Sequence, residues 1–169
     1  WRVRYGYFAT KNRYFFCYKL STMKSIFQSI SQGHYPTACG EFAISRVRDL
    51  QVGYDSGEAD QKARLPRSSY MVTFYFENGA VITVRGSGTE PKLKYYAELS
   101  GSFADKEQVD ATLSATLAAL IHDLLKPEAN DLKLPRDKLL QEYNSHQARP
   151  SSHTRLLAST HDYALTHSE

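Results

Sequence analysis

Apolar residues recur at every second position between residues 70 and 76, which is the pattern of a half-buried strand. The dipeptide Asn78-Gly79 follows, and it is typical of a tight hairpin turn. The β-branched run 81–84 then supplies a partner strand, and a second extended run covers 93–99. These patterns predict strands that are joined by hairpins and therefore antiparallel.

A further strand is expected over residues 41–50, where the alternation slips at Arg46-Val47 and indicates a bulge or a strand end. Residues 14–18 form an aromatic-rich extended run, and residues 51–69 read as a polar loop. Four carboxylates at the end of the expected strand and in this loop are expected to lie on a solvated surface: Asp49, Asp55, Glu58 and Asp60.

Two stretches carry apolar residues at helical spacing. The first is predicted to begin with Ser21 as N-cap and to end at Gly33, and its apolar face holds Met23, Ile26, Phe27 and Ile30. The second is predicted to begin at Asp105, with Gln108 completing a capping box, and to end before Pro127. Its apolar stripe holds Val109, Leu113, Leu117, Leu120, Ile121 and Leu124. Together the elements predict an α+β domain with a mainly antiparallel four-stranded sheet and two helices.

Composition narrows the class of protein. The chain has 169 residues, is 41% hydrophobic and has a formal net charge of +3, with no run of five or more Lys or Arg. That balance does not require a nucleic-acid partner. No apolar stretch approaches the ~18 residues of a membrane span, so no membrane partner is expected. Cys17 and Cys39 stand in contexts unlike a metal site, and reduced thiols in the cytoplasm are the expectation.

The stretch 85–91 has the chemistry to hold a phosphate. Arg85 offers a guanidinium fork, and Ser87 and Thr89 offer hydroxyl donors. Gly86 and Gly88 permit positive φ angles, with which successive N–H groups can form an anion nest. The alternative is a glycine-rich hairpin loop with a solvated arginine. The better-known phosphate loops do not fit, because here a proline, and not a helix, follows the glycines.

The run Arg85-Gly86-Ser87-Gly88-Thr89-Glu90-Pro91 resembles the phosphate-binding signature in the last domain of the α-D-phosphohexomutase family. The resemblance is greatest to the eukaryotic branch of phosphoglucomutase-2, phosphopentomutase and glucose-1,6-bisphosphate synthase. That branch typically reads Arg-Thr-Ser-Gly-Thr-Glu-Pro-Lys-Ile-Lys-Tyr-Tyr-Ala-Glu, which this chain matches through Glu98 except at Gly86 and Leu93. The resemblance covers roughly residues 1–135. Other stretches also resemble this branch and occur in the same order: Tyr5-Gly6-Tyr7, Tyr35-Pro36, Ala38-Cys39-Gly40, Arg48-Asp49-Leu50, Gly53-Tyr54-Asp55 and Leu65-Pro66.

The resemblance implies a TATA-binding-protein-like domain of an isomerase that moves phosphate within a sugar through a bisphosphorylated intermediate. By position in the motif, the phosphate-contacting residues are Arg85, Ser87, Gly88 and Thr89, with Lys94 as a second basic residue. We expect Lys92 to be solvated and Glu90 to turn away and brace a neighbour. Of the two tyrosines Tyr95 and Tyr96, one is expected in the core and one at the surface.

The family places its phosphoserine, its magnesium ligands and its sugar-reading loop on upstream domains, and none of those motifs occurs here. The resemblance therefore implies no catalytic residue and no metal site in this chain, and no activity of the chain alone. Its implied partners are glucose or ribose phosphates and the upstream mutase domains. Magnesium, held by those domains, and a sugar bisphosphate that serves as intermediate or activator are the implied cofactors.

Residues 1–137 are expected to form the phosphate-binding domain, with 1–20 as a linking segment from a preceding domain. Because Trp1 is no initiator, we expect a piece of a longer mutase. Residues 138–169 are polar and predict a disordered tail. The spacing of the tail histidines matches no usual metal site; they are His146, His153, His161 and His167.

Two other functions stay open. One is a free-standing phosphosugar sensor without catalysis. The other is an RNA-binding sheet, although Val72-Thr73-Phe74-Tyr75-Phe76 lacks the Lys/Arg-Gly-Phe lead of an RNA-binding motif.

Overall fold

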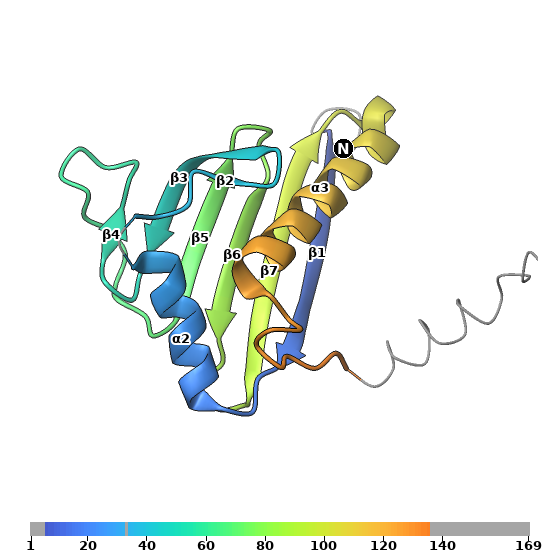
Figure 1. Cartoon of the computed structure of the whole chain (residues 1–169). Coiled ribbons are helices and arrows are strands. Elements are labelled where there is room, and N and C mark those ends of the chain that lie inside the picture. The colour runs from blue at the N-terminus through green and yellow to red at the C-terminus, as the bar shows by residue number, and fades with distance from the viewer. Residues whose placement is uncertain (1–5, 33, 136–169) are drawn as a thin grey trace, which may run out of the picture. The chain divides into compact units, whose positions relative to one another are not determined.

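In the part of the chain that the structure describes, seven strands form one antiparallel sheet, and two helices lie on one of its faces (Figure 1). The computed structural model describes residues 6–32 and 34–135. The strands are β1 (Tyr7–Phe16), β2 (Ala38–Cys39), β3 (Phe42–Asp49), β4 (Tyr54–Asp55), β5 (Met71–Phe76), β6 (Val81–Gly86) and β7 (Lys92–Gly101). The helices are α2 (Leu20–Ser31) and α3 (Lys106–Leu120); a 3-10 turn (Phe103–Asp105) precedes α3 and a π-helical turn (Ile121–Leu125) follows it.

The strand order is β1-β7-β6-β5-β3-β2, with β4 paired to β3 off this path. The predicted α+β class, the antiparallel pairing and the two helices are confirmed, but the predicted number of four strands is wrong. The edge strand β1 begins well before the predicted extended run 14–18 and pairs with β7 over ten residues, from Tyr7 opposite Gly101 to Phe16 opposite Lys92. The sequence patterns did not predict the short strands β2 and β4. Whether residues 1–20 also connect to a preceding domain stays a prediction.

The predicted hairpin between β5 and β6 is confirmed. Gly79 has a φ of +87°, which favours glycine, and its N–H donates to the carbonyl oxygen of Phe76 at 3.0 Å. The Asn78 side chain accepts from the Ala80 N–H at 3.0 Å and so closes the turn. The predicted irregularity in the 41–50 strand is confirmed too, as a register shift between Ile44 and Arg46.

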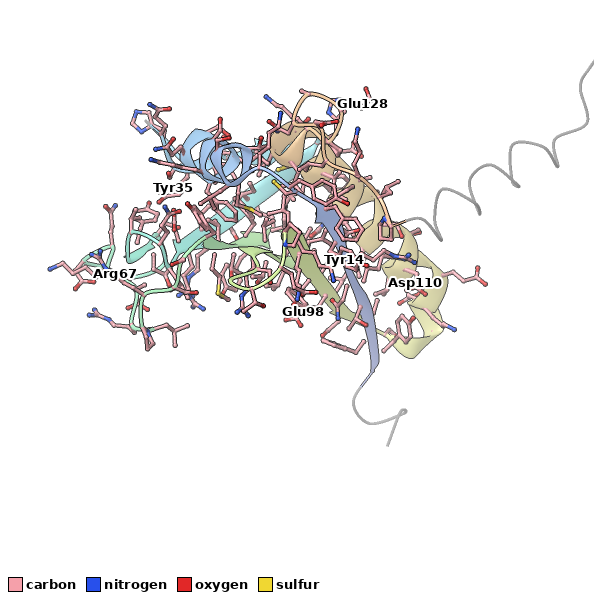
Figure 2. All side chains as sticks on the ribbon, turned by 90° about the horizontal axis from the view of Figure 1, so that it is seen from below. Tyr14, Tyr35, Arg67, Glu98, Asp110 and Glu128 are labelled. Carbon is pink, nitrogen blue, oxygen red and sulfur yellow. The ribbon has the colours of Figure 1, made fainter. Side chains whose placement is uncertain are left out.

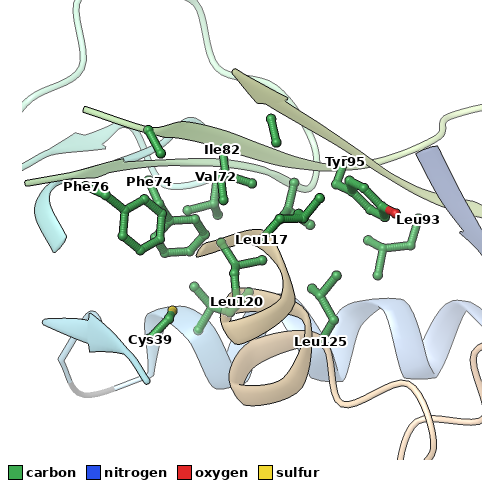
Figure 3. Packing of buried hydrophobic residues seen from close by; sticks show 14 of the residues in the cluster. Cys39, Val72, Phe74, Phe76, Ile82, Leu93, Tyr95, Leu117, Leu120 and Leu125 are labelled. Atoms are coloured by element: carbon green, nitrogen blue, oxygen red, sulfur yellow. The ribbon is translucent and has the colours of Figure 1, made fainter. Parts of the chain in front are cut away.

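The core fills the space between the sheet and the two helices (Figure 3). Alternate residues of β5, β6 and β7 point into it, and the predicted face of the first helix is buried against them. On α3, Val109, Leu113, Leu117 and Leu120 are buried as predicted. In the π-helical turn that follows, Ile121 and Leu124 are only half-buried, and Leu125 is buried instead. Figure 2 shows both helices on one side of the sheet and Glu98 on the other. The face of the sheet away from the helices is called the outer face below.

The helix caps differ from the prediction. Helix α2 begins one residue before Ser21, with Lys19 as N-cap and no side-chain cap bond. Asp105 makes no side-chain cap bond either, because the chain first forms the 3-10 turn, in which the Ser102 side chain accepts from the Ala104 N–H. Gln108 donates instead to the Thr112 hydroxyl at 3.3 Å.

Some predictions fall on residues outside the described ranges: Gly33 as a helix stop, and the tail 138–169 with its histidines. Within 6–32 and 34–135, no helix combines the length and apolar character that crossing a membrane requires.

Candidate phosphate site

The loop 87–91 joins β6 to β7 at the end of the sheet where α2 begins (Figure 1). A cavity of about 550 Å³ lies there. It is lined by the loop, by Leu20 and Met23 of α2, and by the segment 68–70 that leads into β5. Arg85, Ser87, Gly88 and Thr89, the predicted phosphate-contacting residues of the motif, all line this one cavity.

Lys94, the fifth predicted residue, does not line the cavity but lies beside it on the outer face. It is directly opposite Arg85 in the β6–β7 register, so both side chains project from the same face of the sheet. Opposed residues of an antiparallel pair have Cβ atoms about 4.5–5.5 Å apart. The sheet therefore brings two cations together at the edge of the cavity.

The backbone of the loop does not form the predicted nest. The Gly86 N–H donates to the Tyr70 carbonyl oxygen at 2.8 Å, and the Ser87 N–H donates to the Lys92 carbonyl oxygen at 2.9 Å. Neither Gly86 nor Gly88 has a positive φ. In the part of the chain that the structure describes, the N–H groups of Gly88 and Thr89 have no acceptor. The Glu90 N–H likewise has no acceptor among the described residues, so the loop offers three amides and two hydroxyls.

Gly86 is required by packing. A Cβ at this position would lie 2.9 Å from the Cβ of Tyr70 and 3.3 Å from the Sδ of Met23. Tyr70 itself has a φ of +49°, an uncommon conformation for a tyrosine, and its ring packs against Phe27 of α2 with centroids 5.3 Å apart. The Tyr70–Gly86 contact therefore fixes the start of the loop against α2.

The charges around the loop are unevenly paired. Arg85 is exposed and has no acidic partner among residues 6–32 and 34–135. Glu90 contacts both neighbouring lysines, with 2.5 Å from its Oε1 to Lys92 Nζ and 3.2 Å from its Oε2 to Lys94 Nζ. The hydrogen bond from Lys92, and then that from Lys94, lowers the pKa of Glu90. Glu90 thus braces its neighbours, as predicted, but it lines the cavity and does not turn away from it.

The expectation that Lys92 is solvated is wrong. Its side chain is only 20% exposed, and its Nζ lies 4.6 Å from the ring centroid of Tyr14 on β1. The sequence could not show this contact, because β1 was not predicted as a neighbour of β7. The prediction for the next tyrosines is confirmed, since Tyr95 is buried and Tyr96 is exposed.

Two carboxylates expected at a solvated surface are instead buried, since Asp49 and Asp55 are each 1% exposed. Asp55 accepts hydrogen bonds from Arg46 at 2.6 and 2.7 Å and from Arg48 at 2.7 Å. The Arg46 guanidinium, the largest influence, holds the pKa of Asp55 well below its ordinary value. Asp49 accepts from the Tyr35 hydroxyl at 3.0 Å.

The Asp55 ion pairs fasten the long loop 51–69 to β3, and the end of that loop lines the cavity. A signal for this was present: Arg46 and Arg48 are two residues apart, so one face of a strand carries both. A buried acidic partner is the usual condition for bringing two arginines into a partly buried position.

The described ranges contain no group of three or more His, Cys, Asp or Glu that could hold a metal ion. Cys17 and Cys39 are both free and buried. Burial raises the pKa of Cys39 to about 12. A second cavity of about 430 Å³ lies between residues 17–25 and 129–131; of the loop residues discussed above, it contains none.

Comparison with known proteins relates the sequence of this chain to one family. Residues 46–115 match the phosphoglucomutase/phosphomannomutase C-terminal domain. The chain is 43% identical to a phosphopentomutase of Homo sapiens over 143 residues, which are 80% of this chain and 23% of that protein. It is 45% identical to a glucose 1,6-bisphosphate synthase of Homo sapiens over 137 residues, 76% of this chain and 22% of that protein.

A more distant relative is a probable phosphoribomutase of Schizosaccharomyces pombe, 38% identical over 139 residues, with 78% of this chain and 23% of that protein covered. The chain thus spans less than a quarter of the length of these curated relatives. The matched residues include β5, β6 and β7 with the loop between the last two. Residues 46–115, which include the candidate loop, therefore form a C-terminal domain of the phosphoglucomutase and phosphomannomutase family.

Proposed function

We propose that this chain is the phosphate-binding C-terminal domain of a phosphosugar mutase related to phosphopentomutase and glucose-1,6-bisphosphate synthase. Its loop holds the substrate phosphate that is not being transferred. The observation that carries the proposal is Arg85, a cation without an acidic partner among the described residues, beside the hydroxyls of Ser87 and Thr89 at one cavity. Charge-assisted bonds of this kind are what a phosphate dianion accepts.

The pairing of Arg85 with Lys94 supports an anion at the same place. Like charges directly opposite each other on a sheet repel and destabilise it. An anion beside both side chains removes that repulsion. Glu90 supplies a single negative charge to Lys94 and none to Arg85, so a bound phosphate has a cation left to meet.

The chemistry of the loop suits a mutase. A mutase that works through a sugar bisphosphate must turn this intermediate round, so that each phosphate occupies the clamp in turn. Hydroxyls, amides and a guanidinium grip the phosphate and do not read the sugar, so both orientations are held alike. Binding the remote phosphate also aligns the reacting one, which lowers the barrier to transfer.

Magnesium and the transferable phosphate belong, in this proposal, to other parts of the protein. The described residues contain no group of three or more His, Cys, Asp or Glu that could hold a metal ion, and we assign to this chain only the binding and orienting of the substrate. The partners are accordingly glucose or ribose phosphates, as substrate or bisphosphate, and the preceding mutase domains. A cytoplasmic location fits two buried free cysteines.

An NMR titration of the 169-residue chain tests the proposal. Inorganic phosphate, glucose 1-phosphate and ribose 5-phosphate should each shift the amide signals of Gly88 and Thr89 and the side-chain signal of Arg85, whereas glucose should not. Arg85→Ala should abolish these shifts. Arg64→Ala is the matched control, because Arg64 is exposed and pairs with Glu58 and Asp60 outside the cavity. Shifts elsewhere, or shifts that survive in Arg85→Ala, contradict the proposal.

A further inference from the structure

Glu90 is a carboxylate at a place where an anion is proposed to bind. Of the described residues that line the cavity, it is the one acidic residue. A fixed negative charge beside a phosphate repels it, and this costs affinity. Its position therefore calls for a role that offsets the repulsion.

The two lysines that Glu90 contacts are held differently. Lys92 has Glu90 and also the rings of Tyr14 and Phe16, at 4.6 and 5.8 Å from its Nζ. Lys94 has Glu90 alone among its partners in the described ranges, and its side chain is 32% exposed. If the ion pairs of Glu90 break, Lys92 still contacts the aromatic rings, whereas Lys94 can move.

The phosphate site is the place near Lys94 where an anion is expected to bind. Lys94 lies opposite Arg85 on the outer face, next to the loop that carries the hydroxyls. Its long, flexible stem carries a compact point charge that adapts to whichever oxygen is present. Lys94 is thus within the neighbourhood of the phosphate but is occupied by Glu90.

We propose that Glu90 is the internal counter-ion of the phosphate site. It holds Lys94 while the site is empty, and it gives Lys94 up to the phosphate when a phosphosugar binds. This inference rests on the proposed function and adds a residue that sets how tightly the phosphate is held. No covalent step is involved, only an exchange of ion pairs.

The local charges fit this role. Arg85, Lys92 and Lys94 with Glu90 leave a net charge of +2 around the loop, and a phosphate monoester at neutral pH carries about −1.5 to −2. Without the Glu90 charge the loop is more positive than the ligand needs. Such a loop binds the phosphate more tightly and releases it more slowly. A clamp that must let go of each phosphate in turn is served by weaker binding.

The test is calorimetric titration of the 169-residue chain with inorganic phosphate. Glu90→Gln should bind phosphate about two- to fivefold more tightly, which is the value of an exposed ion pair. Glu58→Gln is the matched control, since Glu58 is also partly exposed and contacts two cations, Arg46 and Arg64, away from the cavity. That control should bind phosphate as the unchanged chain does.

A double substitution shows whether Glu90 acts through Lys94. Lys94→Met alone should weaken phosphate binding, and adding Glu90→Gln to it should restore little. In the unchanged chain, the Lys94 Nζ signal should shift with phosphate and that of Lys92 should move far less. This measurement decides the point even if a variant folds poorly.

The outcomes separate the two proposals. If Arg85→Ala loses binding but Glu90→Gln binds phosphate equally or more weakly, the counter-ion role is wrong and the clamp stands. If the gain in Glu90→Gln persists in the Lys94→Met background, or Lys94 Nζ does not respond, the role is likewise wrong. If phosphate does not bind at the loop of the unchanged chain, the proposed function itself fails.

Discussion

Arg85 is an exposed cation at the cavity, and it differs from Arg46, Arg48 and Arg64 in its ion pairing. Arg46 and Arg48 share the buried carboxylate of Asp55, and Arg64 contacts Glu58 and Asp60. Arg85 has no such partner in the part of the chain that the structure describes. Its charge is therefore available to an external anion without the cost of first breaking an ion pair.

Replacing Arg85 tests this at the level of one side chain. A hydrogen bond to a charged group contributes about 1.5–3 kcal/mol, so Arg85→Ala should weaken phosphate binding by roughly tenfold to over a hundredfold. Arg85→Lys keeps the charge but loses the planar fork, so its phosphate affinity should lie between those of the unchanged chain and Arg85→Ala. In a longer protein that contains this domain and the rest of a mutase, kcat/KM for a phosphosugar should fall by a similar factor. Unchanged values for Arg85→Ala would exclude Arg85 from the site.

The residues of the candidate site could be predicted from the sequence because they are neighbours in the chain. Arg85, Ser87, Gly88 and Thr89 reach one cavity simply by sharing one loop. Their hydrogen bonds could not be predicted. The acceptors for the amides of Gly86 and Ser87 are carbonyl oxygens on other segments, and only the strand register brings them there.

At the scale of elements, periodicity predicted those strands and helices that bury one clear face. It predicted only the end of β1, from residue 14, because the middle of this strand, Lys11-Asn12-Arg13, carries no apolar residue and lies at the edge of the sheet. Its pairing is set by backbone bonds along the full length of β7, to which a hydrophobic pattern is blind. Asp105 is the N-cap residue of α3, as predicted, but the expected cap bond is absent, because a 3-10 turn capped by Ser102 precedes the helix.

The junction of β6 with α2 makes a specific demand on Gly86. Gly86→Ala places a methyl group 2.9 Å from the Cβ of Tyr70, which is closer than side chains tolerate. We expect the free energy of unfolding to fall by about 1–3 kcal/mol. Chemical denaturation measures it. Gly88→Ala is the control, because nothing lies within 4 Å of a Cβ there, and it should change stability far less. Equal effects of the two substitutions would show that the Tyr70 contact does not govern this position.

The pairing of Asp55 with two arginines ties the loop 51–69 to β3. Asp55→Asn keeps the shape but removes the charge that Arg46 and Arg48 share, so the free energy of unfolding should fall by about 2–4 kcal/mol at pH 7. Urea denaturation of both proteins measures the difference. Glu77→Gln, in the exposed hairpin, is a suitable control.

The same pair gives a pH dependence whose sign is fixed. The pKa of Asp55 is lower in the folded chain than the ordinary aspartate value of about 3.9. Its contribution to stability is therefore complete above that ordinary value and is lost as the pH falls towards the folded pKa. Between pH 5 and about pH 2, the unchanged chain should lose more stability than Asp55→Asn does. Parallel curves for the two proteins would contradict the assignment.

For the whole molecule, both helices cover one face of the sheet, and the phosphate loop lies at one end of it, beside the start of α2 (Figure 1). Within the described part of the chain, this arrangement leaves the loop open to water. The relatives that the chain matches are more than four times as long as the matched segment. In the proposed function, the parts that read the sugar and transfer phosphate lie in that additional length.

The chain by itself should therefore bind phosphosugars weakly and without preference. One arginine, two hydroxyls and three amides offer a few charge-assisted bonds, but association costs several kcal/mol of lost freedom before any gain is seen. Solvent also screens each contact at an open site. Glucose 1-phosphate, glucose 6-phosphate and ribose 5-phosphate should each have a Kd on the order of millimolar, about −4 kcal/mol. In the proposed function the groups that transfer phosphate lie elsewhere, so no conversion between these sugar phosphates should be detected with or without magnesium. NMR titrations and a time course of the sugar phosphate signals measure both. Micromolar binding that is selective for one sugar would instead support a free-standing sensor, and measurable turnover would show that the chain holds catalytic groups that the proposal places elsewhere.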